Sequence, residues 1–401
     1  NLFWANTIAG ILLFGVCVIV AHAVAAFYGR PELAGLTVAM GSGFLFGGLA
    51  VQPNALLTRQ MRLKASSIVE IFSFAASTGI AILLALGGYG YWALVGQSVS
   101  WQVIRAALMF WASGYWPGLP ARNKETLELL KFGGYLAGFG FVNYFARNLD
   151  NVLVGKMWGA EQLGYYSRAY YLMTLPTLLF SSSFGSVMIA ALSASSRDRA
   201  KMSAAYVSAV KAIALLAFPI AAGLCAAAPE AVRAVYGPKW APVVPLIAWL
   251  SIAAISQPIY GTASWLFISS GQSRPMFLWA VVSTPVLAAG FFIAARISVV
   301  AVAISYALLI TVLTLPIMHF AHRAAGIELR KTVRALLPIF CWAVLCGVLS
   351  YFFGNMLYAL HFPWVAILAG KAALFAGLYL ILSFRSIAPL YAQLMYRTVP
   401  A

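Results

Sequence analysis

The sequence predicts an all-α membrane protein, a polytopic bundle of transmembrane helices, and three observations lead to this prediction. Hydrophobic residues make up 63% of the 401 residues and charged residues only 9%, whereas a soluble domain has about 25% charged residues. The apolar residues occur in long runs. The basic residues, which produce a net charge of +17, gather in short loops between those runs. This placement argues against nucleic-acid binding, because no polybasic domain is present.

A membrane-spanning helix requires about 20 predominantly apolar residues, and the sequence contains twelve such runs. In order, the predicted spans are 7–28, 33–56, 66–87, 91–113, 133–155, 162–190, 203–228, 242–270, 275–295, 298–321, 335–353 and 364–384. If the spans alternate in direction, 16 of the 26 Lys and Arg residues fall in loops on one side, 4 on the other, and six in or beside spans. The positive-inside rule places the side with 16 in the cytosol, so both termini are expected there.

A polar stripe lies on one face of predicted span 133–155, at Asn143, Arg147, Asp150 and Asn151, which follow helical spacing. A charged side chain at bilayer depth costs about 2.5–3.5 kcal/mol on insertion scales, so such residues usually face an interior cavity. Arg147 and Asp150, three residues apart, suit a self-neutralising ion pair. They equally suit a substrate-binding arginine beside an acid that orients it or acts as a proton-linked switch, and the sequence leaves both interpretations open.

Three further cations lie within predicted spans, at Arg105, Arg168 and Lys211. We expect two tiers, with Arg105 and Lys211 nearer the cytosol and Arg147 and Arg168 nearer the outside. Arginine binds phosphate through a bidentate fork and lysine through a point charge, so this arrangement suits an anionic substrate. The candidate substrate-binding residues are Arg105, Arg147, Asp150, Asn151, Arg168 and Lys211.

Catalytic and cofactor motifs are missing from the sequence. It contains no Walker-type phosphate loop, no H-E-x-x-H or G-x-S-x-G motif and no Cys/His metal cluster. The sequence therefore predicts neither an enzyme nor a cofactor or metal site. Lys371, in the last predicted span, receives no clear role, because that span need not line a cavity.

The stretch 147–170 carries an R-x-x-D-N run followed by G-A-x-x-L-G-Y-Y-S-R-A-Y. It resembles the signature of the Wzx-type polysaccharide flippases, in their colanic-acid-type branch, within the multidrug/oligosaccharidyl-lipid/polysaccharide exporter superfamily. Residues 57–64 and 184–200 also resemble that family, so the resemblance covers essentially the whole chain.

The resemblance implies a two-lobed transporter of fourteen spans, of which two are expected to precede residue 1. Residues 1–113 would be the remainder of the N-terminal lobe, with four spans, and 133–321 the C-terminal lobe, with six. Residues 322–401 would form two accessory spans and a cytosolic tail. The longest charged connection, 114–132, is independently predicted to be a cytosolic linker, and it falls at the implied lobe boundary.

The resemblance also implies a function, the translocation of an undecaprenyl-pyrophosphate-linked oligosaccharide repeat unit across the bacterial inner membrane for surface polysaccharide synthesis. Expected partners are this lipid-linked anionic oligosaccharide, the bilayer, and polysaccharide polymerase and export machinery. Two other transporters remain as alternatives, a flippase for lipid-linked cell-wall precursors and a cation-coupled multidrug exporter. The exporter should carry more buried carboxylates than this sequence does. A membrane lipid-linked sugar transferase or ligase would need catalytic residues in a sizeable outer loop, where only Glu230 qualifies.

Overall fold

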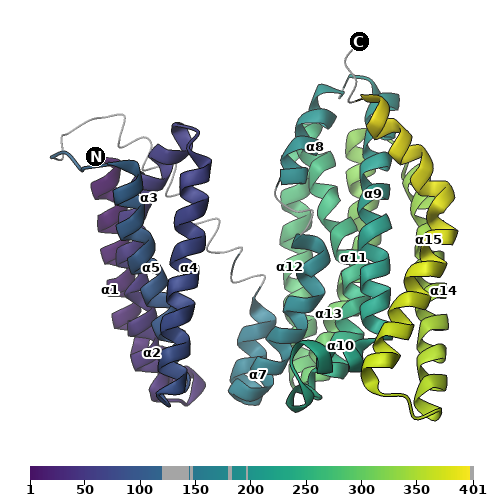
Figure 1. Ribbon diagram of the computed structural model, residues 1–401. Coiled ribbons are helices and arrows are strands. Elements are labelled where there is room, and N and C mark those ends of the chain that lie inside the picture. The colour runs from purple at the N-terminus through teal and green to yellow at the C-terminus, as the bar shows by residue number, and fades with distance from the viewer. Residues whose placement is uncertain (120–143, 145–147, 179–182, 196, 398–401) are drawn as a thin grey trace. The chain divides into compact units, whose positions relative to one another are not determined.

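All regular structure in the described part of the chain is helical, which confirms the predicted fold class. The structure is a computed structural model, and it describes residues 1–119, 144, 148–178, 183–195 and 197–397 (Figure 1). Within these residues nine helices are long and apolar enough to cross a membrane. They are Leu2–Tyr28, Glu32–Arg59, Leu63–Leu86, Arg199–Ala226, Val243–Ser269, Arg274–Ala295, Val299–Ala325, Leu329–Ala359 and Trp364–Phe384. Each coincides with one of the twelve predicted spans.

The remaining three predicted spans need separate treatment. Span 91–113 corresponds to α5 (Trp92–Ser113), which is long enough to cross a membrane. Its mean hydropathy is lower than that of the nine helices, because it contains Gln97, Gln102 and Arg105. Two of these polar side chains contact α4 (Leu63–Leu86): Gln97 Nε2 donates to Thr78 Oγ1 at 3.0 Å, and Arg105 pairs with a carboxylate on α4. Spans 133–155 and 162–190 lie partly outside the described residues, so the total of twelve stays a prediction.

The chain divides into two compact units, Asn1–Tyr144 and Phe145–Ala401. In the first unit, α3 (Gly43–Arg59) packs between α1 (Leu2–Tyr28) and α5, while α5 also packs along α4. The short helix α2 (Glu32–Gly41) precedes α3 and joins it at Ser42. Large apolar side chains on α1 and α4 are exposed, as expected of helices that face lipid.

The closest backbone approach in this unit lies between α1 and α3. A Cβ atom on Gly10 would lie 2.5 Å from Phe44 O, and one on Gly48 would lie 2.6 Å from Asn6 O. Small residues permit such approach, and the van der Waals packing that results favours helix association in a membrane. Gly43 and Gly47, four residues apart, also have a spacing that permits close helix packing. Gly43, however, faces the Gln102 side chain on α5 and no backbone atom of another helix.

Substitution of Gly48 by leucine is expected to separate α1 from α3. Because the new side chain would meet backbone atoms, the overpacking should lower the free energy of unfolding by about 1–3 kcal/mol. The melting temperature of the purified protein in detergent would report it. Gly79→Leu on α4 is the matched control, since a Cβ there meets nothing within 4 Å. Equal shifts in the two variants would contradict the close approach.

The second unit is organised around α11 (Val243–Ser269), which contributes to both core clusters of this unit although some of its side chains, such as Trp249 and Ile252, stay exposed. One core cluster joins α11 to α9 (Arg199–Ala226), α13 (Val299–Ala325), α14 (Leu329–Ala359) and α15 (Trp364–Arg397). The other cluster joins α11 to α7 (Leu149–Leu178), α12 (Ser273–Ala295) and α13. The smaller elements are α8 (Ser183–Ala194), α10 (Ala228–Val235) and the 3₁₀ turn η1 (Pro238–Trp240).

The helices α14 and α15, predicted to be an accessory pair, belong to this second unit, and α14 packs along α9. Helix α13 continues to Ala325, past the predicted boundary at 321, and ends at Gly326, whose backbone is left-handed with φ of 68°. The division into lobe, linker and accessory pair stays a prediction, because most of 114–132 lies outside the described residues.

Candidate functional site

The polar site in the second unit is built on a helical hairpin. Residue Gly159 of α7 has φ of 81° and ψ of 179°, a conformation that only glycine adopts readily. Across this break Tyr166 Oη donates to Asp150 Oδ2 at 2.8 Å. Sixteen residues of straight helix would separate these two side chains by about 24 Å. The chain therefore reverses at Gly159, between the predicted spans 133–155 and 162–190.

The carboxylate of Asp150 is fully buried in this hairpin. Besides the Tyr166 phenol, it accepts hydrogen bonds from the backbone N–H of Asn151 at 2.8 Å and from Asn151 Nδ2 at 3.3 Å. These donors compensate part of the desolvation of a buried charge. The structure thus brings Asp150 and Asn151 together and adds Tyr166, whose role the sequence did not indicate because the tyrosines at 165–171 are typical of a membrane interface.

An aromatic group extends this site toward α13 and α12. The ring of Tyr166 lies 6.3 Å from that of Tyr170, and Tyr170 Oη lies 3.3 Å from Tyr306 Oη on α13. Tyr306 in turn stacks on Phe291 of α12 with ring centroids 5.9 Å apart. The buried carboxylate is therefore linked through three tyrosines to α13, and through ring stacking on Phe291 to α12. Phenols and aromatic faces suit hydrogen bonding and stacking with sugars.

The other polar residues of the predicted stripe, Asn143 and Arg147, lie outside the described residues. The ion pair of Arg147 with Asp150 therefore stays a prediction, and so does the role of Arg147 in substrate binding.

Arg168 lies on the second arm of the hairpin, and its side chain is exposed. Its backbone oxygen accepts a hydrogen bond from Tyr236 Oη at 3.4 Å. Burial raises the pKa of the Tyr236 phenol, and the positive charge of Arg168 opposes that rise. Arg168 is therefore close to the segment after α10, an arrangement that sequence spacing does not predict.

In the structure Arg105 has an acidic partner. Arg105 Nε lies 2.6 Å from Glu70 Oε1 on α4, and its guanidinium lies 5.8 Å from the Trp101 ring. Opposite charges within a membrane usually pair with one another, and Arg105 and Glu70 do so across two adjacent helices.

Lys211, on α9, is half-buried. The ion pairs among the described residues include neither Lys211 nor Arg168. The predicted two tiers stay a prediction, because Arg105 belongs to the first unit and Arg168 and Lys211 to the second, and each unit is described by itself.

Sequence reasoning missed a buried ion pair in the second unit. Lys371 Nζ on α15 lies 2.8 Å from Glu230 Oε1 on α10, and the two side chains are 2% and 0% exposed. The ammonium also donates to Ala226 O at 3.1 Å. A lysine in the middle of an apolar span was the available signal, but its partner lies 141 residues away.

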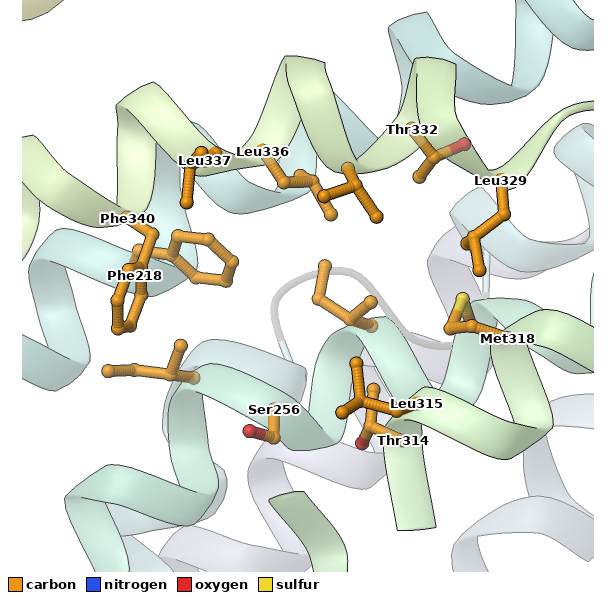
Figure 2. Close-up of a pocket in the computed structure, with 13 residues that line it drawn as sticks. Phe218, Ser256, Thr314, Leu315, Met318, Leu329, Thr332, Leu336, Leu337 and Phe340 are labelled. Carbon is orange, nitrogen blue, oxygen red and sulfur yellow. The ribbon is translucent and has the colours of Figure 1, made fainter. Parts of the chain in front are cut away.

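Two cavities open between helices of this unit. The first, of about 240 Å³, lies between α9, α11, α13 and α14 and is lined by apolar side chains with few hydroxyls, among them Ser256, Thr314 and Thr332 (Figure 2). Its lining suits apolar ligand atoms and offers no charge to a pyrophosphate. The second, of about 380 Å³, adjoins Lys371 and Ser350. In the described part of the chain no three His, Cys, Asp or Glu side chains converge to hold a metal ion.

Comparison with known proteins identifies relatives of the chain. The profile of a family described as "Polysaccharide biosynthesis protein" matches residues 1–245. Teichuronic acid biosynthesis protein TuaB of Bacillus subtilis is 26% identical over 70% of this chain and 58% of its own length. Succinoglycan biosynthesis transport protein ExoT of Rhizobium meliloti is 26% identical over 70% and 57%. Lipopolysaccharide biosynthesis protein WzxC of Escherichia coli is 20% identical over 71% and 58%.

The chain thus spans a little under three fifths of the length of these curated relatives. Among solved structures, the lipid II flippase MurJ in an inward closed conformation is similar, with a TM-score of 0.69. That likeness covers 96% of this chain and 83% of MurJ at 14% identity, so it supports the fold alone.

Proposed function

Because the chain belongs to the polysaccharide biosynthesis protein family, we propose that it is a flippase for an undecaprenyl-pyrophosphate-linked oligosaccharide. The repeat unit would move across the bacterial inner membrane toward surface polysaccharide synthesis. The observation that carries the proposal, beside the family, is a set of cationic side chains within apolar helices. Arg168 and Lys211 have no acidic partner among the described residues. Such groups are costly in a bilayer, so they usually face the interior of the helix bundle and mark a path for a substrate or ion.

Each candidate residue has a distinct role in this proposal. Arg168 and Arg147 would bind the pyrophosphate or acidic sugars by bidentate hydrogen bonds, and Lys211 would attract them by charge. Arg105 would participate only when it separates from Glu70. Asp150, which accepts hydrogen bonds from Tyr166 and Asn151, would keep the hairpin in shape beside the substrate path.

The membrane placement belongs to the same proposal. Both termini would lie in the cytosol, because that orientation puts 16 basic loop residues inside and 4 outside. The segment between α9 and α11 would then lie at the outer face, near Arg168. Polysaccharide polymerase and export machinery would act on the product, and no nucleic acid is involved.

A flippase assay tests the proposal. The full-length protein would be reconstituted in proteoliposomes, and movement of a pyrophosphate-linked oligosaccharide lipid between leaflets would be followed. Arg168→Ala is expected to reduce transport about 10- to 100-fold, because it removes charge-assisted hydrogen bonds of about 1.5–3 kcal/mol. Arg147→Ala should behave similarly.

The matched control is Arg323→Ala, which removes an exposed arginine near the C-terminal end of α13, about 25 Å along that helix from Tyr306 and the hairpin. Equal effects of Arg168→Ala and Arg323→Ala would refute the cationic path. Parallel assays with a lipid-linked cell-wall precursor and with a cationic drug would identify the two transport alternatives. Cleavage or transfer of the sugar without movement would indicate an enzyme.

A further inference from the structure

Lys371 reaches across a neighbouring helix to make its ion pair. It belongs to α15, yet its ammonium contacts the carbonyl of Ala226 at the end of α9 and the carboxylate of Glu230 on α10. The α14 helix leaves room for this path at Gly354, where a Cβ atom would overlap Lys371 Cε. Ser350 Oγ on α14 donates to the backbone oxygen of Lys371 at 3.1 Å. The Lys371 side chain thus extends from α15 past α14 and contacts both α9 and α10.

Helix α10 packs on α11 and also lies against α15. The packing against α15 is incomplete, because a cavity of about 380 Å³ is lined by residues of both elements, Ala231 on α10 and Leu368 and Ala372 on α15. The guanidinium of Arg233 lies 5.1 Å from the Trp364 ring, but this contact is exposed and therefore weaker. The ion pair of Lys371 with Glu230 is fully buried and is therefore the strongest polar contact described between the two elements.

From α10 the contacts continue to the α7 hairpin. Tyr236, one residue after α10, donates to Arg168 O, and its ring lies 5.4 Å from that of Trp240. Trp240 meets Tyr165 edge-on, with centroids 5.7 Å apart. Both contacts are made on the α7 arm that carries Arg168. A movement of α10 would therefore be transmitted to this arm.

We propose that Lys371 is a positioning residue for Arg168. Through Glu230 and the α10 turn, it fixes the hairpin arm that presents the arginine. The accessory helix α15 would thereby take part in substrate binding without contacting the substrate. The effect on transport depends on the proposed function, whereas the mechanical link from α15 to α7 does not.

Hydrogen–deuterium exchange of the full-length protein in detergent tests the link. In Lys371→Met, amides of 228–240 and of 160–172 are expected to exchange about tenfold or more faster than in wild type, because local opening becomes easier. Lys371→Met/Glu230→Gln should do the same without leaving an unpaired buried charge, which guards against misfolding. Gly354→Ala should reproduce the effect by closing the path of the lysine.

Two variants serve as controls. Gly377→Ala changes a position on α15 where a Cβ atom would meet nothing within 4 Å. Lys331→Met removes the exposed ion pair of Lys331 with Glu328. Neither should alter exchange in 160–172. Faster exchange in 228–240 with unchanged exchange in 160–172 would overturn the proposal, because the link would then end at α10.

A transport measurement separates positioning from general stabilisation. Lys371→Met is expected to raise the substrate concentration for half-maximal transport about tenfold, and adding it to Arg168→Ala should produce little further loss, because both variants act through the same arginine. Independent, multiplying effects would overturn the proposal. A wild-type protein that moves no candidate substrate would refute the proposed function, and the exchange comparison would still decide the link.

Discussion

Replacement of Lys371 by methionine is expected to lower the free energy of unfolding by about 3–5 kcal/mol. The loss arises at Glu230, because its buried carboxylate would no longer have the Lys371 ammonium at 2.8 Å. A buried charge without compensation is far more costly than the loss of the attraction itself. Equilibrium unfolding in mixed detergent and sodium dodecyl sulfate, followed by circular dichroism, would measure the difference.

The matched control is Lys331→Met. Lys331 pairs with Glu328 at 3.2 Å, but the two side chains are 59% and 66% exposed, so water replaces the interaction and the loss should stay below about 1 kcal/mol. The double variant Lys371→Met/Glu230→Gln should recover much of the lost stability, because no unpaired charge remains. Equal losses for Lys371→Met and Lys331→Met would contradict the burial of the pair.

The helical membrane fold could be predicted because its cause is local. Long apolar runs bounded by basic residues predict spans from composition alone, and nine described helices coincide with predicted spans. The reversal near Gly159 was predictable for the same reason, since a short polar stretch separates two apolar runs. The polar face that contains Asp150 and Asn151 followed from helical spacing.

The partners of the charged residues could not be predicted, because they depend on contacts between distant segments. Arg105 and Glu70 are 35 residues apart, and Lys371 and Glu230 are 141 apart. Sequence shows that each side chain is costly in a membrane, but it does not show which opposite charge lies beside it. The sequence therefore did not show that Arg105 pairs with Glu70, and the role of Arg105 in the substrate path stays a prediction.

Helix packing shows the same limit. Gly43 and Gly47 have the spacing of a close helix crossing, yet Gly43 faces the flexible side chain of Gln102. The backbones touch at Gly10 and Gly48, which lie on different helices. The spacing of glycines along one helix identifies a face that another helix can approach closely. Whether another helix packs there depends on the residues of that second helix.

Tyr166→Phe is expected to be the second most destabilising of these changes. The phenol is fully buried and donates to the buried carboxylate of Asp150 at 2.8 Å, and a hydrogen bond to a charged group contributes about 1.5–3 kcal/mol. The exposed phenol–carboxylate pair of Tyr165 with Glu161, also at 2.8 Å, provides the matched control. Tyr165→Phe should cost less than about 0.5 kcal/mol, because water replaces its partner and an exposed substitution usually stays within that limit.

The same unfolding titration would compare the two phenylalanine variants. A combined Tyr166→Phe/Asp150→Asn variant should lose less than the sum of its single changes, because both remove one shared interaction. Additive losses would show that Tyr166 and Asp150 act separately and that the hairpin does not depend on their contact. Non-additive losses together with reduced transport would connect the closure of the hairpin at Gly159 to the presentation of Arg168.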